Sequence, residues 1–284
     1  MSRPRKSLLF GLVALLLAGL TISATRSIEP VYQGKSLSQW LALLDPAKPA
    51  EAQAAAEQAF EHFGPAALPF LVSELEHKPS KLLGLLNQTR DKLFPDGSQA
   101  RQQERRRLQS RESERITKAI EAVGRRSPES LGPLLHNPAS TSCTAQACVS
   151  LGGRGVDLIV GALNDPDPQV RLVLCATLEK VKDSPAATVA LLQRTGDRHP
   201  SVTGMALMAL GFEFGKPPFT VRAVRVLAFH LSSEHAVVRH AAVAGLANHG
   251  TNAAWTAPLI RKLADDDPDP AVRASAVQAL GRVQ

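Results

Sequence analysis

The sequence contains few aromatic residues, few cysteines and none of the common catalytic motifs. Aromatic residues make up 4% of the 284 residues, and much of the 44% apolar content is Ala, Leu and Val, which is typical of helices that pack closely. The three cysteines show no CxxC or CxxH spacing, which argues against a zinc site. The patterns G-x-S-x-G and H-E-x-x-H and paired catalytic carboxylates are also missing. We therefore expect a protein that is not an enzyme and that needs no metal, no other cofactor and no small-molecule substrate.

A basic surface along the whole chain is missing as well, although the net charge is +7. Residues 1–26 contribute +4 of this charge, and residues 101–115 contribute the other +3. The rest of the chain is neutral overall, whereas a protein that binds nucleic acid usually presents a basic patch or stripe. We therefore expect no nucleic-acid partner.

Residues 1–26 have the layout of an export signal: a short basic start, about 13 apolar residues from Leu8 to Leu20, and a small polar tail. A cleaved signal and an uncleaved anchor both fit, because residues 7–24 supply 18 residues and a bilayer span needs roughly 17–25. The positive charges precede the apolar run, so the rest of the chain should face away from the cytoplasm. We expect an extracytoplasmic protein, either anchored in the membrane by residues 7–24 or periplasmic or secreted after cleavage.

The rest of the chain contains a repeat of about 34 residues. The stretch DPDPQVR ends at Arg171, and a near copy, DPDPAVR, ends at Arg273, 102 residues later. Apolar residues three, four and seven positions after these reference residues form one face of a helix, and the pattern recurs after Thr203 and Arg239. The matching lines are residues 54–64, 113–124, 140–153, 168–181, 200–213, 236–249 and 270–283. A second helix lies between consecutive lines, and no alternating strand pattern is present.

These repeats predict an all-α domain of antiparallel helix pairs over residues 36–284, after a linker at 27–35. Its first helix should begin at a capping box formed by Ser36 and Gln39. An irregular basic helical insertion at about 78–124 interrupts the spacing, with a helix at 80–94 and one long helix at 98–124. The first half of the long helix is polar all round and is either a solvated projection or a contact for lipid headgroups, cell-wall polymer or an acidic partner. The residues of this basic helix are Arg105, Arg106, Arg107 and Arg111.

The D-P-D-P-x-V-R line, the A-x-x-A-L-type helix after it, and G-P-A-A-L-P-F-L at 64–71 resemble the HEAT-repeat superfamily, particularly its short bacterial form that also occurs in phycobilin lyases. The resemblance covers about residues 36–284. It implies a right-handed α-solenoid of about six to seven antiparallel helix pairs. It says little about function, because such scaffolds have many roles.

The resemblance also implies a ladder in which each arginine meets aspartates of its own or the neighbouring repeat. The residues of this ladder are Asp165, Arg171, Asp197, Arg239, Asp267 and Arg273. We expect Arg171 to reach Asp197, and Arg239 to reach Asp267.

The ladder is incomplete, because Thr203 stands in place of an arginine and Ser233 in place of an aspartate. A calcium site in the DPDP turns is the alternative to a structural ladder. A rigid turn followed by an arginine offers too few converging oxygens for calcium, so we favour the ladder.

At 100° per residue, positions two, five and nine after the reference residue lie on the helix face opposite the core. The resemblance to HEAT repeats implies that this face lines the concave groove. Here these positions include Met205, Met208 and Phe212, which are apolar where solvent is expected. Methionine is adaptable and common at peptide-binding surfaces, so we predict a partner-binding surface. Its residues are Val173, Met205, Met208, Phe212, Ala241, Gln278 and Arg282. The alternative is local core, either because the helix is rotated or because residues 211–219 fold back over the methionines.

The cysteines, Cys143, Cys148 and Cys175, occupy positions that are apolar in the other repeats, so we expect them in the core. Cys148 and Cys175 fall on adjacent repeats. Packed helix axes lie about 8–10 Å apart and a disulfide needs Cα atoms within about 7 Å, which leaves a disulfide between them open.

The leading interpretation is a non-catalytic scaffold, exported or membrane-tethered, that binds another protein through its concave face. The resemblance offers two alternatives: a lyase or chaperone-like factor related to phycobilin-lyase HEAT proteins, and a nucleic-acid-binding HEAT protein. Export argues against the first, since those relatives act on cytoplasmic chromoproteins. The neutral charge of the repeats argues against the second.

Overall fold

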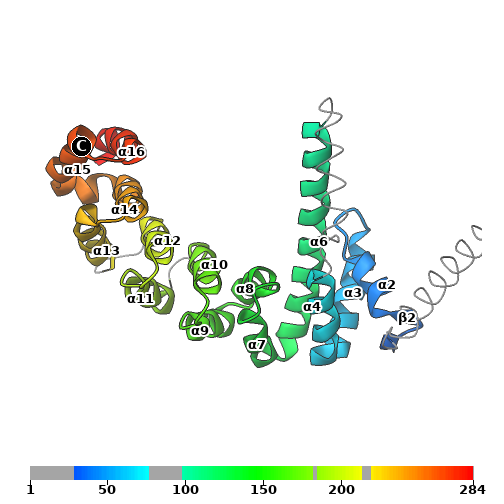
Figure 1. Ribbon diagram of the computed structural model, residues 1–284. Helices are drawn as coiled ribbons and strands as arrows, with labels where there is room; N and C mark the ends of the chain where they lie inside the picture. The colour runs from blue at the N-terminus through cyan, green and yellow to red at the C-terminus, as the bar shows by residue number, and fades with distance from the viewer. Residues whose placement is uncertain (1–28, 77–97, 182–183, 213–218, 284) are drawn as a thin grey trace, which may run out of the picture.

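The computed structural model describes residues 29–76, 98–181, 184–212 and 219–283, in which helices form two rows (Figure 1). A short helix, α2 (Leu37–Leu43), comes first. We define the inner row as α3 (Ala50–Phe63), α6 (Ser98–Arg126), α8 (Thr141–Ser150), α10 (Pro168–Leu178), α12 (Pro200–Gly211), α14 (Ala236–His249) and α16 (Pro270–Val283). The outer row is α4 (Leu68–Glu76), α7 (Gly132–Leu135), α9 (Gly153–Ala162), α11 (Pro185–Arg194), α13 (Phe219–Phe229) and α15 (Ala257–Asp266). The predicted all-α solenoid is confirmed.

Short 3₁₀ helices lie at several of the connections between the rows. They are η1 (Gly64–Ala67), η2 (Pro128–Leu131), η3 (His230–Ser232) and η4 (Gly250–Thr256). Gly64, Gly152 and Gly250 follow inner helices and have φ values of 55°, 70° and 54°, a region that side chains with a Cβ rarely adopt. These glycines let the chain leave an inner helix and enter the outer row at once.

The two rows form an arc with the inner row on its concave side (Figure 1). Neighbouring helices pack more closely in the inner row than in the outer row. Buried apolar residues four apart, such as Val170, Leu174 and Leu178 on α10, fill the space between the rows. The concave face is therefore made of inner-row side chains that point away from this core.

A small hairpin precedes the first helix, in the range expected to be a linker. Its strands, β1 (Val31–Tyr32) and β2 (Lys35–Ser36), are antiparallel. Gln33 and Gly34 both have positive φ, as a tight two-residue hairpin turn requires. The sequence did not indicate this hairpin, because strands of two residues are too short to show alternation.

The capping box at the start of α2 is confirmed. The backbone N–H of Ser36 donates to the side chain of Gln39 at 2.9 Å, and the backbone N–H of Gln39 donates to the hydroxyl of Ser36 at 3.5 Å. The buried indole of Trp40 donates to the carbonyl of Tyr32 at 3.0 Å. These bonds fix the hairpin against the first end of the solenoid.

Several expectations lie outside the described residues. They are the signal or anchor at 1–26, the helix at 80–94 and most of the segment at 211–219 that was considered as a cover for the methionines. Within the ranges that the structure describes, no helix is long and apolar enough to cross a membrane.

Candidate protein-binding surface

The turns that enter the inner helices share one construction. Side-chain oxygens of Asp165, Asp197 and Asp267 accept the backbone N–H of the residue two positions later, at 2.7, 2.9 and 2.9 Å. Ser233 does the same through its hydroxyl at 3.3 Å. These short loops set where each inner helix begins and bring one polar side chain of each turn to the edge of the solenoid.

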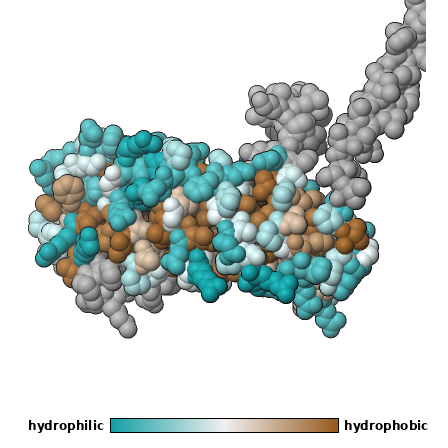
Figure 2. Space-filling model, turned by 90° about the horizontal axis from the view of Figure 1, so that it is seen from below, coloured by the Kyte–Doolittle hydropathy of each residue, from teal (hydrophilic) through white to brown (hydrophobic). Residues whose placement is uncertain are grey.

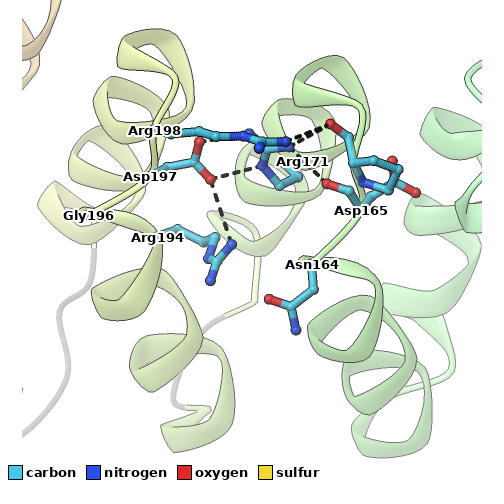
Figure 3. Close-up of a pocket in the computed structure, with 8 residues that line it drawn as sticks. Asn164, Asp165, Arg171, Arg194, Gly196, Asp197 and Arg198 are labelled. Atoms are coloured by element: carbon cyan, nitrogen blue, oxygen red, sulfur yellow. Dashed lines mark hydrogen bonds and ion pairs between the residues drawn. The ribbon is translucent and has the colours of Figure 1, made fainter.

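Arg171 joins two consecutive turns (Figure 3). Its Nε and Nη2 donate to both carboxylate oxygens of Asp197, each at 2.8 Å. Its Nη1 donates to the carbonyls of Asp165 and Pro166 at 2.8 and 3.0 Å. The Arg171 and Asp197 side chains are only 4% and 3% exposed, so this is a buried bidentate pair.

Arg239 repeats the arrangement two repeats later. It donates to both oxygens of Asp267 at 2.7 and 2.8 Å and to the carbonyls of Ser233 and Glu234. The predicted pairs are therefore formed, and each arginine meets the aspartate of the next repeat. Arg273 donates to the carbonyls of Asp267 and Pro268 in its own turn.

The charges of both pairs are stabilised by their partners. Hydrogen bonds from Arg239 lower the pKa of Asp267 below its ordinary value, and burial opposes them only in part. Burial raises the pKa of Asp197, but hydrogen bonds from Arg171 and from the His199 N–H outweigh it and leave this pKa lowered as well. Both carboxylates are therefore ionised at neutral pH, and both pairs are structural rather than proton-transferring groups.

The two gaps in the ladder belong to one missing pair. Because each arginine meets the aspartate of the next repeat, the partner expected for position 203 is position 233. Thr203 and Ser233 are both uncharged, so neither a buried arginine nor a buried aspartate is left alone. The Thr203 hydroxyl donates to the carbonyl of Asp197 at 3.0 Å and so keeps one of the contacts that the arginines make.

Close helix packing accompanies this missing pair. A Cβ placed on Gly211 would lie 2.4 Å from the Cα of Gly245, and one placed on Gly204 would lie 3.7 Å from the Cβ of Ala241. Helices α12 and α14 therefore approach almost backbone to backbone. Ala241 faces α12 in this contact and is 3% exposed.

The DPDP turn at Asp165 has both carboxylate oxygens in use. Oδ1 accepts the N–H of Asp167, and Oδ2 lies 2.6 Å from Nδ1 of His136 in the preceding repeat. Among the described residues, no group of three or more His, Cys, Asp or Glu side chains is placed to hold a metal ion. Within the described residues, the observed contacts of the acidic turns are thus hydrogen bonds and ion pairs to neighbouring protein groups.

The predicted concave surface is present in part. Met205 and Met208 are half-buried on α12, and Phe212 at its end is 38% exposed. Val173 is half-buried on α10, and on α16 Gln278 and Arg282 are exposed. The methionines also pack against the core, so each is both a core neighbour and a surface residue.

The assignment of Ala241 to this surface was wrong. The glycines between α12 and α14 turn position 241 towards α12, and the exposed positions of α14 are instead Val237 and His240. The repeat register alone could not show this rotation, because it depends on glycines of a neighbouring helix.

All three cysteines are buried, as predicted, and are free thiols. Burial raises the pKa of Cys148 and of Cys175 to about 12, and it also raises the pKa of Cys143. Thiols with such pKa values are poor nucleophiles at neutral pH.

The basic helix is the first half of α6, which projects beyond the other described helices on the concave side of the solenoid (Figure 1). Arg106 and Arg107 are exposed there, and Arg105 is half-exposed. Arg111 is bound to Asp45 at 2.6 Å and so helps to fix the projecting half to the first repeat. The rest of α6 is an ordinary inner helix, since Ile116 and four later apolar residues are fully buried.

The sequence reasoning missed a second apolar surface, on the outer row. Val221 and Phe229 on α13, Trp255 on η4 and Leu259 on α15 are between 46% and 75% exposed. Figure 2 shows apolar residues in a band along the outer-row side of the molecule, bordered by polar residues. The spacing of Val221, Arg225 and Phe229, four residues apart, was the signal that could have indicated an exposed stripe.

Residues 155–243 and 224–284 match the family model for HEAT repeats. Together the two matches cover residues 155–284. Both buried ladder pairs and most of the concave surface lie within the matched residues. Upstream of the match, α3, α6 and α8 continue the inner row (Figure 1).

Solved structures similar to the chain include a lyase complex, a designed repeat protein and a hydroxylase. A complex of CpcE and CpcF of phycocyanin lyase from Nostoc sp. PCC7120 is 22% identical, covers 54% of this chain and 99% of its own, and has a TM-score of 0.48. A designed armadillo repeat protein in complex with the peptide (KR)4 is 13% identical, with coverages of 88% and 100% and a TM-score of 0.40. Human deoxyhypusine hydroxylase is 19% identical, with coverages of 87% and 95% and a TM-score of 0.37. A comparison with curated protein sequences found no significant match.

Proposed function

We propose that the chain is a non-catalytic scaffold that binds another protein on the concave face of its solenoid. The observation that carries this proposal is the row of Met205, Met208 and Phe212 on α12, which is partly exposed at the middle of that face. Flexible thioether side chains adapt to apolar groups of a partner, and an exposed ring supplies a large contact area.

The ladder keeps this surface in shape. Two bidentate ion pairs hold its turns: Arg171 with Asp197 joins the turns before α10 and α12, and Arg239 with Asp267 joins the turns before α14 and α16. A surface that is ordered before binding loses less entropy when a partner docks. The carboxylates of both ladder pairs are bound to arginines, and burial raises the pKa of the three thiols. Both observations support a role in presentation rather than in chemistry.

Crosslinking followed by reconstitution tests the proposal. A photo-reactive residue at Met208, in the cells that make the protein, should capture a partner that the same residue at Val189 does not. Val189 is 40% exposed on the outer row and is therefore a matched control. Capture from Arg106 alone would place binding on the projecting half of α6 instead. Nucleic acid or a coloured chromophore retained by the purified chain would favour one of the other two functions.

The captured partner then has to bind the full chain in purified form. Met208→Glu should weaken that binding at least tenfold, because it puts a charge into an apolar contact. Val189→Glu should leave it unchanged. Equal effects of the two substitutions would contradict a concave binding surface.

We also propose that the solenoid lies outside the cytoplasm, because residues 1–26 have the pattern of an export signal. The buried native thiols allow a direct test. Gln278→Cys introduces an exposed cysteine, and in intact cells a maleimide that cannot cross membranes should label it. Labelling only after the inner membrane is opened would contradict export.

A further inference from the structure

The apolar surface on the outer row lies over the last two repeats. We define the outer patch as the side chains Val221, Arg225, Phe229, Trp255 and Leu259. Phe229 is 75% exposed and Trp255 is 56% exposed, so both rings are largely in solvent. Val221 and Leu259 add 52% and 46% exposed side chains beside them. Exposed apolar residues gathered in this way mark a contact surface.

The patch belongs to two packed elements rather than to one loop. Val221, Val224 and Arg225 of α13 and Asn252 and Trp255 of η4 line one open cavity of about 510 Å³. Helix α13 continues the surface to Phe229, one turn beyond Arg225. Leu259 extends it on the other side, one turn beyond Trp255 on α15.

The charges on the two segments that carry the outer patch are all positive. Arg222 and Arg225 on α13 and Arg261 and Lys262 on α15 are exposed. Residues 219–229 and 250–262 contain no Asp or Glu. The nearest acids of α15, at 265 and 266, lie in its last turn, beyond the apolar side chains. A partner that is both apolar and anionic therefore fits this surface.

We infer that the outer patch binds the surface of an anionic lipid bilayer. Trp and Phe favour the level of the lipid headgroups, and neighbouring Arg and Lys bind the anionic headgroups. The elements that carry the patch, α13, η4 and α15, belong to the outer row on the convex side of the arc (Figure 1), and a convex side can approach a flat bilayer. This surface is separate from the concave face, so one chain can bind a membrane and a protein partner at once.

Tryptophan fluorescence reports on this contact directly. The chain has two tryptophans, of which Trp40 is 2% exposed and Trp255 is 56% exposed. Because residues 1–26 are themselves proposed to enter a membrane, the measurement has to be local to Trp255 rather than a sedimentation of the whole chain. The full chain is mixed with phosphatidylcholine vesicles that contain phosphatidylglycerol and brominated acyl chains.

We expect a blue shift and bromine quenching of Trp255, both absent in Trp255→Phe and both reduced by high salt. Each of Arg222→Ala and Arg225→Ala should lower the partition coefficient about fivefold, as expected for one cation near an anionic surface. Phe229→Ser should weaken binding, whereas Val237→Ser, at a 49% exposed position on the inner row, should not.

Two results would overturn the inference. One is that the chain binds the vesicles while the emission of Trp255 does not shift and is not quenched by the bromine. The chain would then be attached to the membrane through residues outside the outer patch. The other is that the variant Phe229→Ser no longer binds a purified acidic protein but still binds vesicles as the native chain does. That result would make the outer patch a protein-binding surface.

Discussion

Arg239→Thr removes four hydrogen bonds from the second ladder pair. Two go to the Asp267 carboxylate at 2.7 and 2.8 Å, and two go to the carbonyls of Ser233 and Glu234 at 2.9 and 3.0 Å. The Asp267 side chain is 1% exposed, so the substitution leaves a buried carboxylate without its cation. Breaking a buried ion pair on one side costs about 3–5 kcal/mol of the free energy of unfolding.

The double variant Arg239→Thr with Asp267→Ser copies the uncharged pair that the chain already has at Thr203 and Ser233. Threonine can keep one contact to its own turn, as Thr203 does with the Asp197 carbonyl at 3.0 Å. Serine can still accept the backbone N–H two residues later, as Ser233 does. We therefore expect the double variant to be more stable than Arg239→Thr by at least about 1 kcal/mol.

Urea unfolding followed by circular dichroism measures these differences as shifts in the midpoint. A double variant that loses the sum of the two single losses would refute the pairing argument, because it would show no coupling between the two side chains.

The pH dependence of the same variants gives a second check. The pKa of Asp267 is lowered in the folded chain, while an unfolded Asp titrates near about 3.9. The contribution of the pair is therefore complete above about pH 4 and is lost as the pH falls below that value. The stability difference between the native chain and the double variant should shrink in acid.

Three further predictions concern other buried positions. Burial lowers the pKa of His249 and of His230, so the folded chain should lose stability as the pH falls below about 6.5. His249→Gln should reduce this dependence, and the double variant with His230→Gln should reduce it further, in urea titrations at pH 5 and 7. Gly211→Ala should lower the free energy of unfolding by about 1–3 kcal/mol, because its Cβ would lie 2.4 Å from backbone. Gly281→Ala, whose Cβ would have nothing within 4 Å, should not lower it, and thermal unfolding compares the two variants. Cys148 and Cys175, with pKa values of about 12, should react with a thiol reagent only after urea is added, and fast labelling of the native chain would contradict their burial.

The sequence predicted the parts of the fold that depend on local signals. Prolines at the first position of α10 and α12, and the apolar spacing after them, placed the inner helices within a few residues. The ladder partners followed from the repeat register, because a residue at the same position in each repeat lies at the same height along the solenoid. The resemblance to HEAT repeats indicated that the arginines and aspartates at this register form a ladder between repeats.

Features set by contacts between distant residues were not predictable in this way. The burial of Ala241 depends on Gly204 and Gly211, which let α12 and α14 approach more closely than the other inner helices. The exposure of Phe229 and Trp255 depends on what covers the outer row, and apolar spacing within one helix does not reveal that.

The most direct test of the account compares the affinity of a purified partner, captured from Met208, for three full-length chains. The account predicts that Met208→Glu binds at least tenfold more weakly than the native chain and that Val189→Glu binds equally well. Native affinity in Met208→Glu, together with loss of binding in Val189→Glu, would contradict a concave protein-binding surface.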